Sequence, residues 1–353
     1  MSEATRNIPH ETLQRFVEEL FAAGGMRPQE SAWFAETIIR SNLWGVDSHG
    51  IIRVPTYFER IRKGAINCAA HIQVERRAGA VTLVDGDGAA GAVAGRAAME
   101  QAIQDARHHG IGVSGVTNSN HFGAAALYSR LAAEQGMIGI SMTNVRPLMA
   151  APGARAAVAG NNPFSVAIPT FCGFPFVLDM SLSVVAGGKL HLAAAKGETI
   201  PLDWAVDPEG RPTDDPKKAL EGFLLPIGGY KGLGLAYAVD ILCGVITGGL
   251  FADEMRSMYH DPDVPSLTGH MMLAMDLSAW ITPEEMRRRM ERYRGFLRSV
   301  PLAEGAPPLV FPGEIEAAQE KKRRLEGIPV PLSTLEILSS LKDEYGICAE
   351  LPS

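Results

Sequence analysis

The chain has few cysteines, no excess of basic residues and no charge-free apolar run long enough to span a membrane. Its four cysteines, Cys68, Cys172, Cys243 and Cys348, lie far apart and form no Cys-x-x-Cys pair. This spacing argues against a zinc knuckle and indicates a reducing cytoplasm. The net charge of −7 and the pI near 5.8 argue against a nucleic-acid-binding protein, because such proteins normally carry a basic patch.

Signals for secretion, membrane insertion and metal binding are also missing. The opening MSEATRNIPHETLQRF lacks a basic region followed by an apolar core, so no secretion signal is visible. Gly232 to Phe251 has the length of a membrane span, but Asp240 and several glycines favour a buried helix of a soluble protein. The cluster His260-Asp261-Pro262-Asp263 lacks convincing ligand spacing, and no bound metal is predicted.

The 353 residues, of which 46% are hydrophobic, can bury a large core divided into two or three lobes. Apolar stripes at helical spacing predict two amphipathic helices within residues 10–44, and residues 1 to about 75 form a helical lobe. From about Ala78, short strands alternate with helices, which predicts an α/β sheet sandwiched by helices. Asp203–Pro216 is interpreted as a surface loop, and the tail returns to helices.

The stretch VDSHGIIRVPTY, residues 46–57, combines a hydroxyl, an imidazole, a guanidinium and a phenol. If it turns helical after Asp47-Ser48, then His49, Arg53 and Tyr57 share one face. Such a face suits a small carboxylate, because arginine can bind it bidentately while histidine moves a proton at the neighbouring oxygen. Ser48 could orient the imidazole or merely cap the helix. The competing interpretation is a capped helix with solvated polar residues.

Two glycine- and asparagine-rich segments follow predicted strands. Gly86-x-Gly88-x-x-Gly91 has the form of a Rossmann dinucleotide fingerprint, but the acid at the expected distance, Asp105, lies inside a helix. A glycine-rich turn is therefore the better interpretation. NSNHFG, residues 118–123, lies between a strand and a helix, where ligands of α/β sheets gather. His121 could be a second acid/base group, a cofactor contact or a histidine that caps a turn.

Other candidate residues also lie where strands end or helices begin. They occur in Asn161-Asn162-Pro163, Asp179-Met180-Ser181, Gly229-Tyr230-Lys231-Gly232 and Phe311-Pro312-Gly313-Glu314. Lys231, flanked by glycines at a helix start, is well placed to meet a ribose or phosphate oxygen. The last segment could equally be the ordinary start of a helix.

Taken together, these motifs resemble the type-2 malate/L-lactate dehydrogenase family over nearly the whole chain. That family includes ureidoglycolate dehydrogenase, 2,3-diketogulonate reductase, sulfolactate dehydrogenase and piperideine/pyrroline-2-carboxylate reductases. The segments that carry the resemblance are DSHGIIRVPTY, NSNHFGAAALY, SMTNVRP, GNNPF, VLDMSLSVVAGGKL, GGYKGLGLA, and FPGEIE before GIPVP.

The resemblance implies an α/β fold that is not a Rossmann fold. A helical substrate and dimerisation domain, residues 1–75 plus 282–353, would flank a cofactor-binding α/β domain, residues 76–281. It also implies a cytoplasmic homodimer with active sites near the subunit interface, NAD or NADP as cofactor, and a small-molecule carboxylate as substrate. Neither a nucleic acid nor a membrane is expected as a partner.

The resemblance also assigns roles to single residues. It makes His49 or His121 the proton donor and acceptor, with Ser48 in support. Arg53 would bind the substrate carboxylate, and Tyr57 would line the pocket. The remaining substrate contacts would be Asn161, Gly187, Gly188 and Lys189. The cofactor contacts would be His121, Phe122, Gly123, Ala124, Ala125, Asp179, Met180, Ser181, Lys231, Pro312, Gly313 and Glu314.

Two departures from the family pattern affect the choice of substrate. Ala186-Gly187-Gly188-Lys189 stands where the family commonly reads Ala-Arg-Gly-Lys, so a side chain near the substrate is missing. Cyclic-imine reductases of the family resemble Ala-Arg-Gly-Asp there, and Lys189 therefore favours a 2-oxo or 2-hydroxy acid. Asn161 replaces the threonine of a GTNP motif, which leaves the polarity of that contact open.

The sequence therefore predicts an NAD(P)-dependent oxidoreductase that acts on a small 2-oxo or 2-hydroxy carboxylic acid. The enzymatic alternative is a cyclic-imine-2-carboxylate reductase that uses the same pocket. An alternative of another class is a catalytically silent relative that binds a metabolite. That alternative would predict the loss of catalytic side chains, whereas Ser48, His49, Arg53, His121 and Lys231 are all present.

Overall fold

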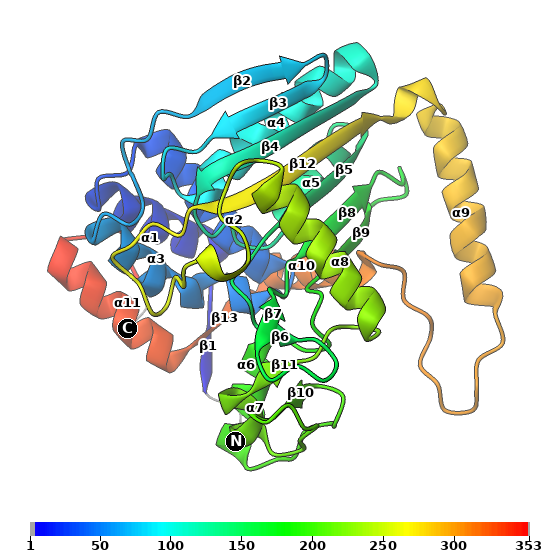
Figure 1. Ribbon diagram of the computed structural model, residues 1–353. Helices are drawn as coiled ribbons and strands as arrows, with labels where there is room; N and C mark the ends of the chain where they lie inside the picture. Colours follow the sequence, from blue (N-terminus) through cyan, green and yellow to red (C-terminus); the bar gives the residue numbers. More distant parts are fainter. Residues whose placement is uncertain (1–3, 352–353) are drawn as a thin grey trace.

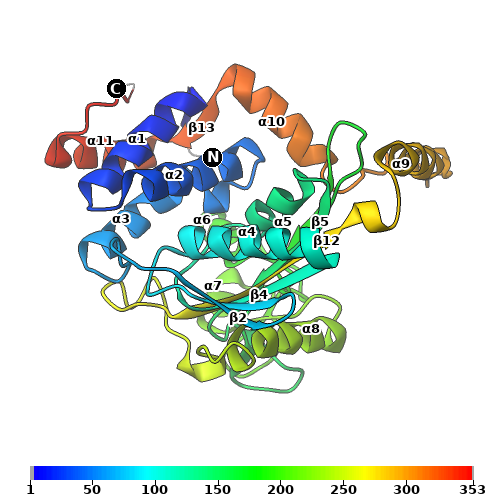
Figure 2. The ribbon, with the colours of Figure 1, turned by 90° about the horizontal axis from the view of Figure 1, so that it is seen from above.

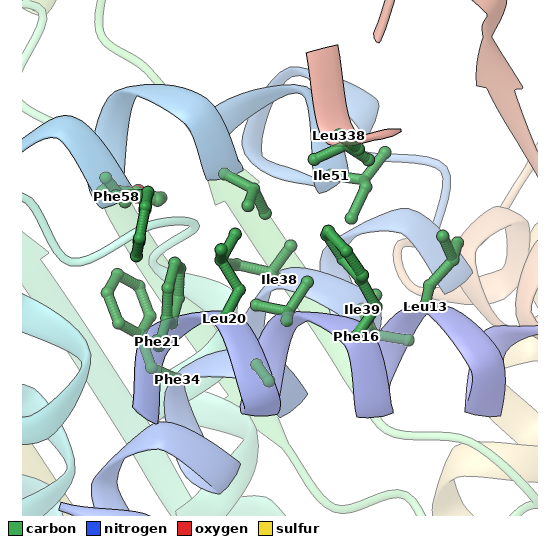
Figure 3. Packing of buried hydrophobic residues seen from close by; sticks show 14 of the residues in the cluster. Leu13, Phe16, Leu20, Phe21, Phe34, Ile38, Ile39, Ile51, Phe58 and Leu338 are labelled. Carbon is green, nitrogen blue, oxygen red and sulfur yellow. The ribbon is translucent and has the colours of Figure 1, made fainter. Parts of the chain in front are cut away.

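The two amphipathic helices at the start of the chain form as their apolar periodicity predicts. In the computed structural model, which describes residues 4–351, α1 spans His10–Ala23 and α2 spans Pro28–Leu43. Pro28 occupies the first turn of α2, where its missing N–H costs nothing. Figure 3 shows the apolar faces of both helices packed together with side chains of neighbouring segments. The residues labelled there are Leu13, Phe16, Leu20, Phe21, Phe34, Ile38, Ile39, Ile51, Phe58 and Leu338.

Both ends of the chain contribute to this helical core. Strand β1 (Thr5–Ile8) pairs antiparallel with β13 (Ile328–Pro331), and α11 (Leu332–Tyr345) packs against α1. Helix α10 (Glu314–Glu326) contacts α2. Helix α9 (Pro283–Ser299), in contrast, stands apart beyond the edge of the main sheet in both views (Figures 1 and 2). The division into two domains, residues 1–75 plus 282–353 and residues 76–281, stays a prediction.

A seven-stranded sheet forms the centre of the molecule, in the order β2-β3-β4-β12-β5-β8-β9. Only β3 and β4 pair in parallel, and the other neighbours are antiparallel. The strands are β2 (Gln73–Ala78), β3 (Val81–Asp85), β4 (Ile111–Ser119), β5 (Met137–Thr143), β8 (Phe164–Ile168), β9 (Phe176–Met180) and β12 (Thr268–Asp276). The predicted α/β class is confirmed.

Helices cover both faces of this sheet. Helices α4 (Gly91–His109) and α5 (Ala126–Ala133) pack on one face, and the helical core lies beyond them (Figure 2). Helix α8 (Tyr230–Asp240) and the π-helical turn Ile241–Val245 pack on the other. The expected arrangement of a sheet between helices is therefore confirmed.

A small four-stranded sheet adjoins the second face. It consists of β6 (Met149–Ala150), β7 (Ala157–Ala159), β10 (Ala205–Val206) and β11 (Phe223–Leu224), with helices α6 (Gly187–Lys196) and α7 (Pro216–Glu221). The interpretation of residues 203–216 as a surface loop is wrong at β10, because Ala205 and Val206 are buried and paired with β11.

The stretch 46–57 is not the single regular helix on which the shared face of His49, Arg53 and Tyr57 depended. It forms two 3-10 turns, Asp47–His49 and Ile51–Arg53, followed by α3 (Val54–Arg62). Gly50 separates the two 3-10 turns because its backbone is extended, with a ψ of −150°. A Cβ at position 50 would lie 2.3 Å from the side-chain amide of Asn42, so only glycine allows the chain to pass this close to Asn42.

The long apolar helix after Gly229 is only half buried. Leu233, Ala236 and Val239 face the sheet, whereas Leu235 and Ile246 are 55% and 64% exposed. The prediction of a buried helix is wrong for this outer face. Among the described residues, no helix has both the length and the apolar character needed to cross a membrane.

Candidate active site

Three aromatic side chains meet where β4 ends and α3 begins. The rings of His49 and His121 stack with centroids 5.7 Å apart and an interplanar angle of 14°. The Tyr57 hydroxyl lies 2.6 Å from Nδ1 of His121. The structure therefore brings together both candidate acid/base histidines and the phenol expected to line the site, although no regular helix aligns them.

The partners of His121 define its tautomer. The backbone N–H of Gly123 donates to His121 Nδ1 over 3.4 Å. Because Nδ1 accepts this hydrogen bond, Nδ1 carries no proton, and the Tyr57 hydroxyl donates to it as well. Neutral His121 therefore carries its proton on Nε2. His121 thus offers a hydrogen-bond donor at Nε2.

Ser48 and Arg53 complete the cluster from the 3-10 turns. The Ser48 hydroxyl lies 2.9 Å from His49 Nδ1, so it orients the imidazole rather than capping a helix. The Arg53 Nε donates to the Ser48 carbonyl over 2.6 Å. The terminal nitrogens of Arg53 make no hydrogen bond within residues 4–351, and the guanidinium is well suited to bind a carboxylate through them.

The surroundings keep both imidazoles neutral. Burial, with a smaller contribution from the Arg53 charge, lowers the pKa of His49 to about 4. Burial also lowers the pKa of His121 well below its usual value, assisted by His49 and Arg53. Of the two, His49 has less desolvation to overcome and is the more readily protonated.

Packing behind the cluster holds it in place. Arg323 of α10 binds Asp47 through both terminal nitrogens, at 2.6 and 2.9 Å, and also donates to the Asn42 carbonyl. Gly91 at the start of α4 lets the chain at residues 120–121 approach closely, because a Cβ there would lie 2.1 Å from the Asn120 oxygen. The turn 86–91 therefore serves the packing beneath His121, as its interpretation as a glycine-rich turn predicts.

The segments expected to contact a cofactor converge around β9. The Ala126 N–H at the start of α5 donates to Asp179 Oδ2 over 3.2 Å. The Val177 N–H donates to the Pro312 carbonyl over 3.3 Å. Phe122–Ala125, Asp179–Ser181 and Pro312–Glu314 are thus neighbours.

Other predicted residues lie outside the histidine cluster. The Asn161 carbonyl accepts the Leu182 N–H over 2.7 Å, which ties the GNNPF segment to the chain after β9. Gly187, Gly188 and Lys189 begin α6, and Lys231 is exposed in the first turn of α8. Within residues 4–351, neither lysine forms a hydrogen bond or ion pair with the histidines.

Two buried groups near the site were not expected from the sequence. His270 is fully buried between Ser119 and Thr143, with its ring stacked on Phe122 at 4.6 Å. Burial lowers its pKa to about 3, so it is a neutral link between β4 and β5. Arg60 is 1% exposed. Neither residue lies in a recognisable motif. Their hydrogen-bond partners come from distant segments, so the local sequence does not reveal their roles.

The fold and these contacts define a class of protein. The protein is an α/β enzyme with two neutral histidines, a serine and an arginine gathered at one end of its main sheet. This set can transfer a proton at an oxygen beside a bound carboxylate. Among the described residues, no three His, Cys, Asp or Glu side chains are grouped to hold a metal ion.

Comparison with known proteins agrees with this class. The sequence profile described as Malate/L-lactate dehydrogenase matches residues 8–339. The L-sulfolactate dehydrogenase of Methanothermobacter thermautotrophicus is 35% identical over 96% of both chains. The NAD(+) ureidoglycolate dehydrogenase of Escherichia coli is 32% identical over 92% of both. The crystal structure of malate dehydrogenase from Entamoeba histolytica superposes with a TM-score of 0.92 at 30% identity, covering 99% of this chain and 100% of that one.

The chain therefore belongs to the malate/L-lactate dehydrogenase family, and the resemblance found in the sequence is confirmed. The finer expectation, that the cofactor domain is distinct from a Rossmann fold, stays a prediction.

Proposed function

We propose that the protein oxidises a small 2-hydroxy acid, and reduces the corresponding 2-oxo acid, with NAD or NADP. The contact that supports this most directly is the stacked pair His49 and His121 beside Arg53. Arg53 would hold the substrate carboxylate so that its C2 oxygen meets the imidazoles. Tyr57, Asn161, Gly187, Gly188 and Lys189 would make the remaining substrate contacts.

The residues around β9 suit a dinucleotide. The Asp179 carboxylate, which accepts the Ala126 N–H, can also accept hydrogen bonds from ribose hydroxyls, and the exposed Lys231 can bind a phosphate. The segments His121–Ala125, Met180–Ser181 and Pro312–Glu314 would complete the cofactor contacts. When bound by these residues, NAD or NADP would supply the hydride acceptor for the hydroxy acid and the hydride donor for the oxo acid.

The two histidines would have different roles at the substrate oxygen. His49, oriented by Ser48, takes the proton of the substrate hydroxyl during oxidation and returns it during reduction. His121 donates from Nε2 to the same oxygen and stabilises its developing negative charge without changing protonation state. Tyr57 holds His121 in this tautomer through the 2.6 Å contact at Nδ1.

We further propose that the working unit is a cytoplasmic homodimer. The four cysteines form no disulfide, which agrees with a reducing compartment. The outer face of α8 and the following turn exposes a run of apolar side chains that a second copy would cover. This run consists of Tyr230, Leu235, Tyr237, Ile241, Val245 and Ile246.

A substrate panel tests the proposed activity. Nicotinamide absorbance would be followed with NAD and NADP and with malate, lactate, sulfolactate and ureidoglycolate, and in reverse with their oxo acids. We expect turnover with at least one 2-hydroxy acid. Turnover of piperideine-2-carboxylate alone would make the protein a cyclic-imine reductase, and binding without turnover of any of these compounds would contradict both enzymatic functions.

A further inference from the structure

A buried arginine on α3 holds a distant loop beside the proposed carboxylate site. Arg60 is 1% exposed and donates to five oxygens at 2.9–3.5 Å. Four of them belong to the loop 258–266. They are the carbonyls of Met258, Asp261 and Val264 and the hydroxyl of Ser266. None is a carboxylate oxygen, so the guanidinium is solvated by oriented dipoles of this loop.

The same loop is tied to the end of β4. Asn120 Oδ1 accepts from Arg60 and from the Ser266 N–H, both over 3.1 Å. The Asn120 side-chain NH2 donates to the carbonyls of Gly88 and Ala89, over 2.8 and 3.0 Å. Asn120 immediately precedes His121, so the loop and the histidine cluster share one support.

The loop residue next to these anchors meets Arg53. Met258 is 8% exposed and belongs to the helical core, which fixes the chain just before Tyr259. The Tyr259 ring then lies with its centroid 5.3 Å from Cζ of Arg53. The ring covers one side of the guanidinium, and the Ser48 carbonyl occupies its Nε.

We infer that Tyr259 orients Arg53 for a substrate carboxylate, and that Arg60 is a positioning residue that holds Tyr259 there. The inference rests on the proposed function, since it concerns the same substrate. With one side and the Nε of Arg53 occupied, the guanidinium presents its terminal nitrogens to the carboxylate as a fixed pair of donors.

Variants of Tyr259 test the contact. Tyr259→Ala should raise KM for the hydroxy acid, and the dissociation constant of oxalate measured by calorimetry, about two- to fivefold, as expected for an exposed cation–π contact. Turnover at saturation should change less than twofold. Tyr259→Phe keeps the ring and should match the wild type, whereas Tyr259→Leu should resemble the alanine variant. Trp280→Ala, which removes another exposed aromatic ring, is the control and should leave both constants unchanged.

The role of Arg60 is tested through a double variant. Arg60→Lys keeps the charge but cannot reach all five acceptors, and it should raise KM without a matching loss of turnover. If Arg60 acts through Tyr259, the double variant Arg60→Lys/Tyr259→Ala should raise KM no more than the larger single change. Additive effects would overturn the positioning role.

The outcomes separate the inference from the proposed function. A wild-type protein that turns over a 2-hydroxy acid, with unchanged KM and unchanged oxalate binding in Tyr259→Ala, contradicts the inference alone. A wild-type protein without turnover contradicts the proposed function, whereas weaker oxalate binding in Tyr259→Ala would still show that Tyr259 orients Arg53.

Discussion

His49 and His121 lie in contact, yet their ring nitrogens have different partners. Nδ1 of His121 accepts from the Gly123 N–H and the Tyr57 hydroxyl, so protonating Nδ1 would break the bond from Gly123 and reverse the bond with Tyr57. Nδ1 of His49 meets only the adaptable hydroxyl of Ser48, which can accept or donate. The difference supports the proposal that His49 transfers the proton and that His121 donates a hydrogen bond.

This division predicts different tolerance to substitution. His49→Ala and His49→Gln should both lower turnover by about 10² to 10⁴, because neither side chain can take up the proton. His121→Gln keeps an N–H donor near the position of Nε2 and should retain far more activity than His121→Ala, which loses about 10² to 10³. Steady-state kinetics on folded variants would measure this. Equal losses in His121→Gln and His121→Ala would assign proton transfer to His121.

The lowered pKa of His49 predicts the pH dependence of the reaction. In the proposed mechanism, reduction of the oxo acid requires protonated His49, whose pKa burial lowers to about 4. The kcat/KM for reduction should therefore fall about tenfold per pH unit from pH 5 to 8, because the protonated fraction of His49 falls by that factor. Oxidation requires the neutral imidazole and should show no histidine-dependent loss down to pH 5. A plateau of the reduction profile below pH 6.5 would show that the pKa of His49 is not lowered.

At the scale of elements, the main sheet and its helices are in direct backbone contact. Gly112 of β4 lies under α4, and a Cβ there would be 2.0 Å from the Ala102 carbonyl oxygen. Gly139 of β5 has the same relation to Ser129 of α5, at 2.1 Å. These contacts set the distance between the sheet and the helices beside His121.

Gly112→Ala should therefore destabilise the protein. The added methyl group must push α4 away from β4, at a cost of about 1 to 3 kcal/mol. Urea unfolding would show this as a lower midpoint with an unchanged slope. Gly295→Ala is the control, because Gly295 is exposed within α9 and an added Cβ would meet no other part of the chain within 4 Å. This variant should stabilise the protein by about 0.5 to 1 kcal/mol. Equal stability of Gly112→Ala and the wild type would contradict the close packing.

At the scale of the whole molecule, the apolar outer face of α8 predicts self-association. Replacing Leu235 and Ile246 with aspartate puts two charges on this face and should convert a dimer to a monomer, because unpaired charges are costly to bury in an interface. Sedimentation velocity at several protein concentrations would measure the change. Leu325→Asp, which alters an 80% exposed residue of α10, should leave the dimer intact. A monomeric wild type, or a double variant that remains dimeric, would rule out this face as the interface.

The sequence by itself determined the elements and the candidate residues. Apolar residues at helical spacing identified α1 and α2, and short apolar runs identified most strands of the main sheet, because these patterns are set by near neighbours in the chain. The motifs around His49, Arg53 and His121 were visible for the same reason. The buried face of α8 was predicted, but its exposed apolar face was not, since apolar character alone does not say which layer covers a side chain.

Only the tertiary structure decided how these residues meet. Gly50 breaks the expected helix, and His49 nevertheless stacks on His121, which lies just after β4 and is held by Tyr57 of α3. Arg60 donates to a loop about two hundred residues further along the chain, so no local sequence pattern predicts these hydrogen bonds. Short-range periodicity specifies the faces of elements, whereas contacts between distant segments depend on how those faces are packed together.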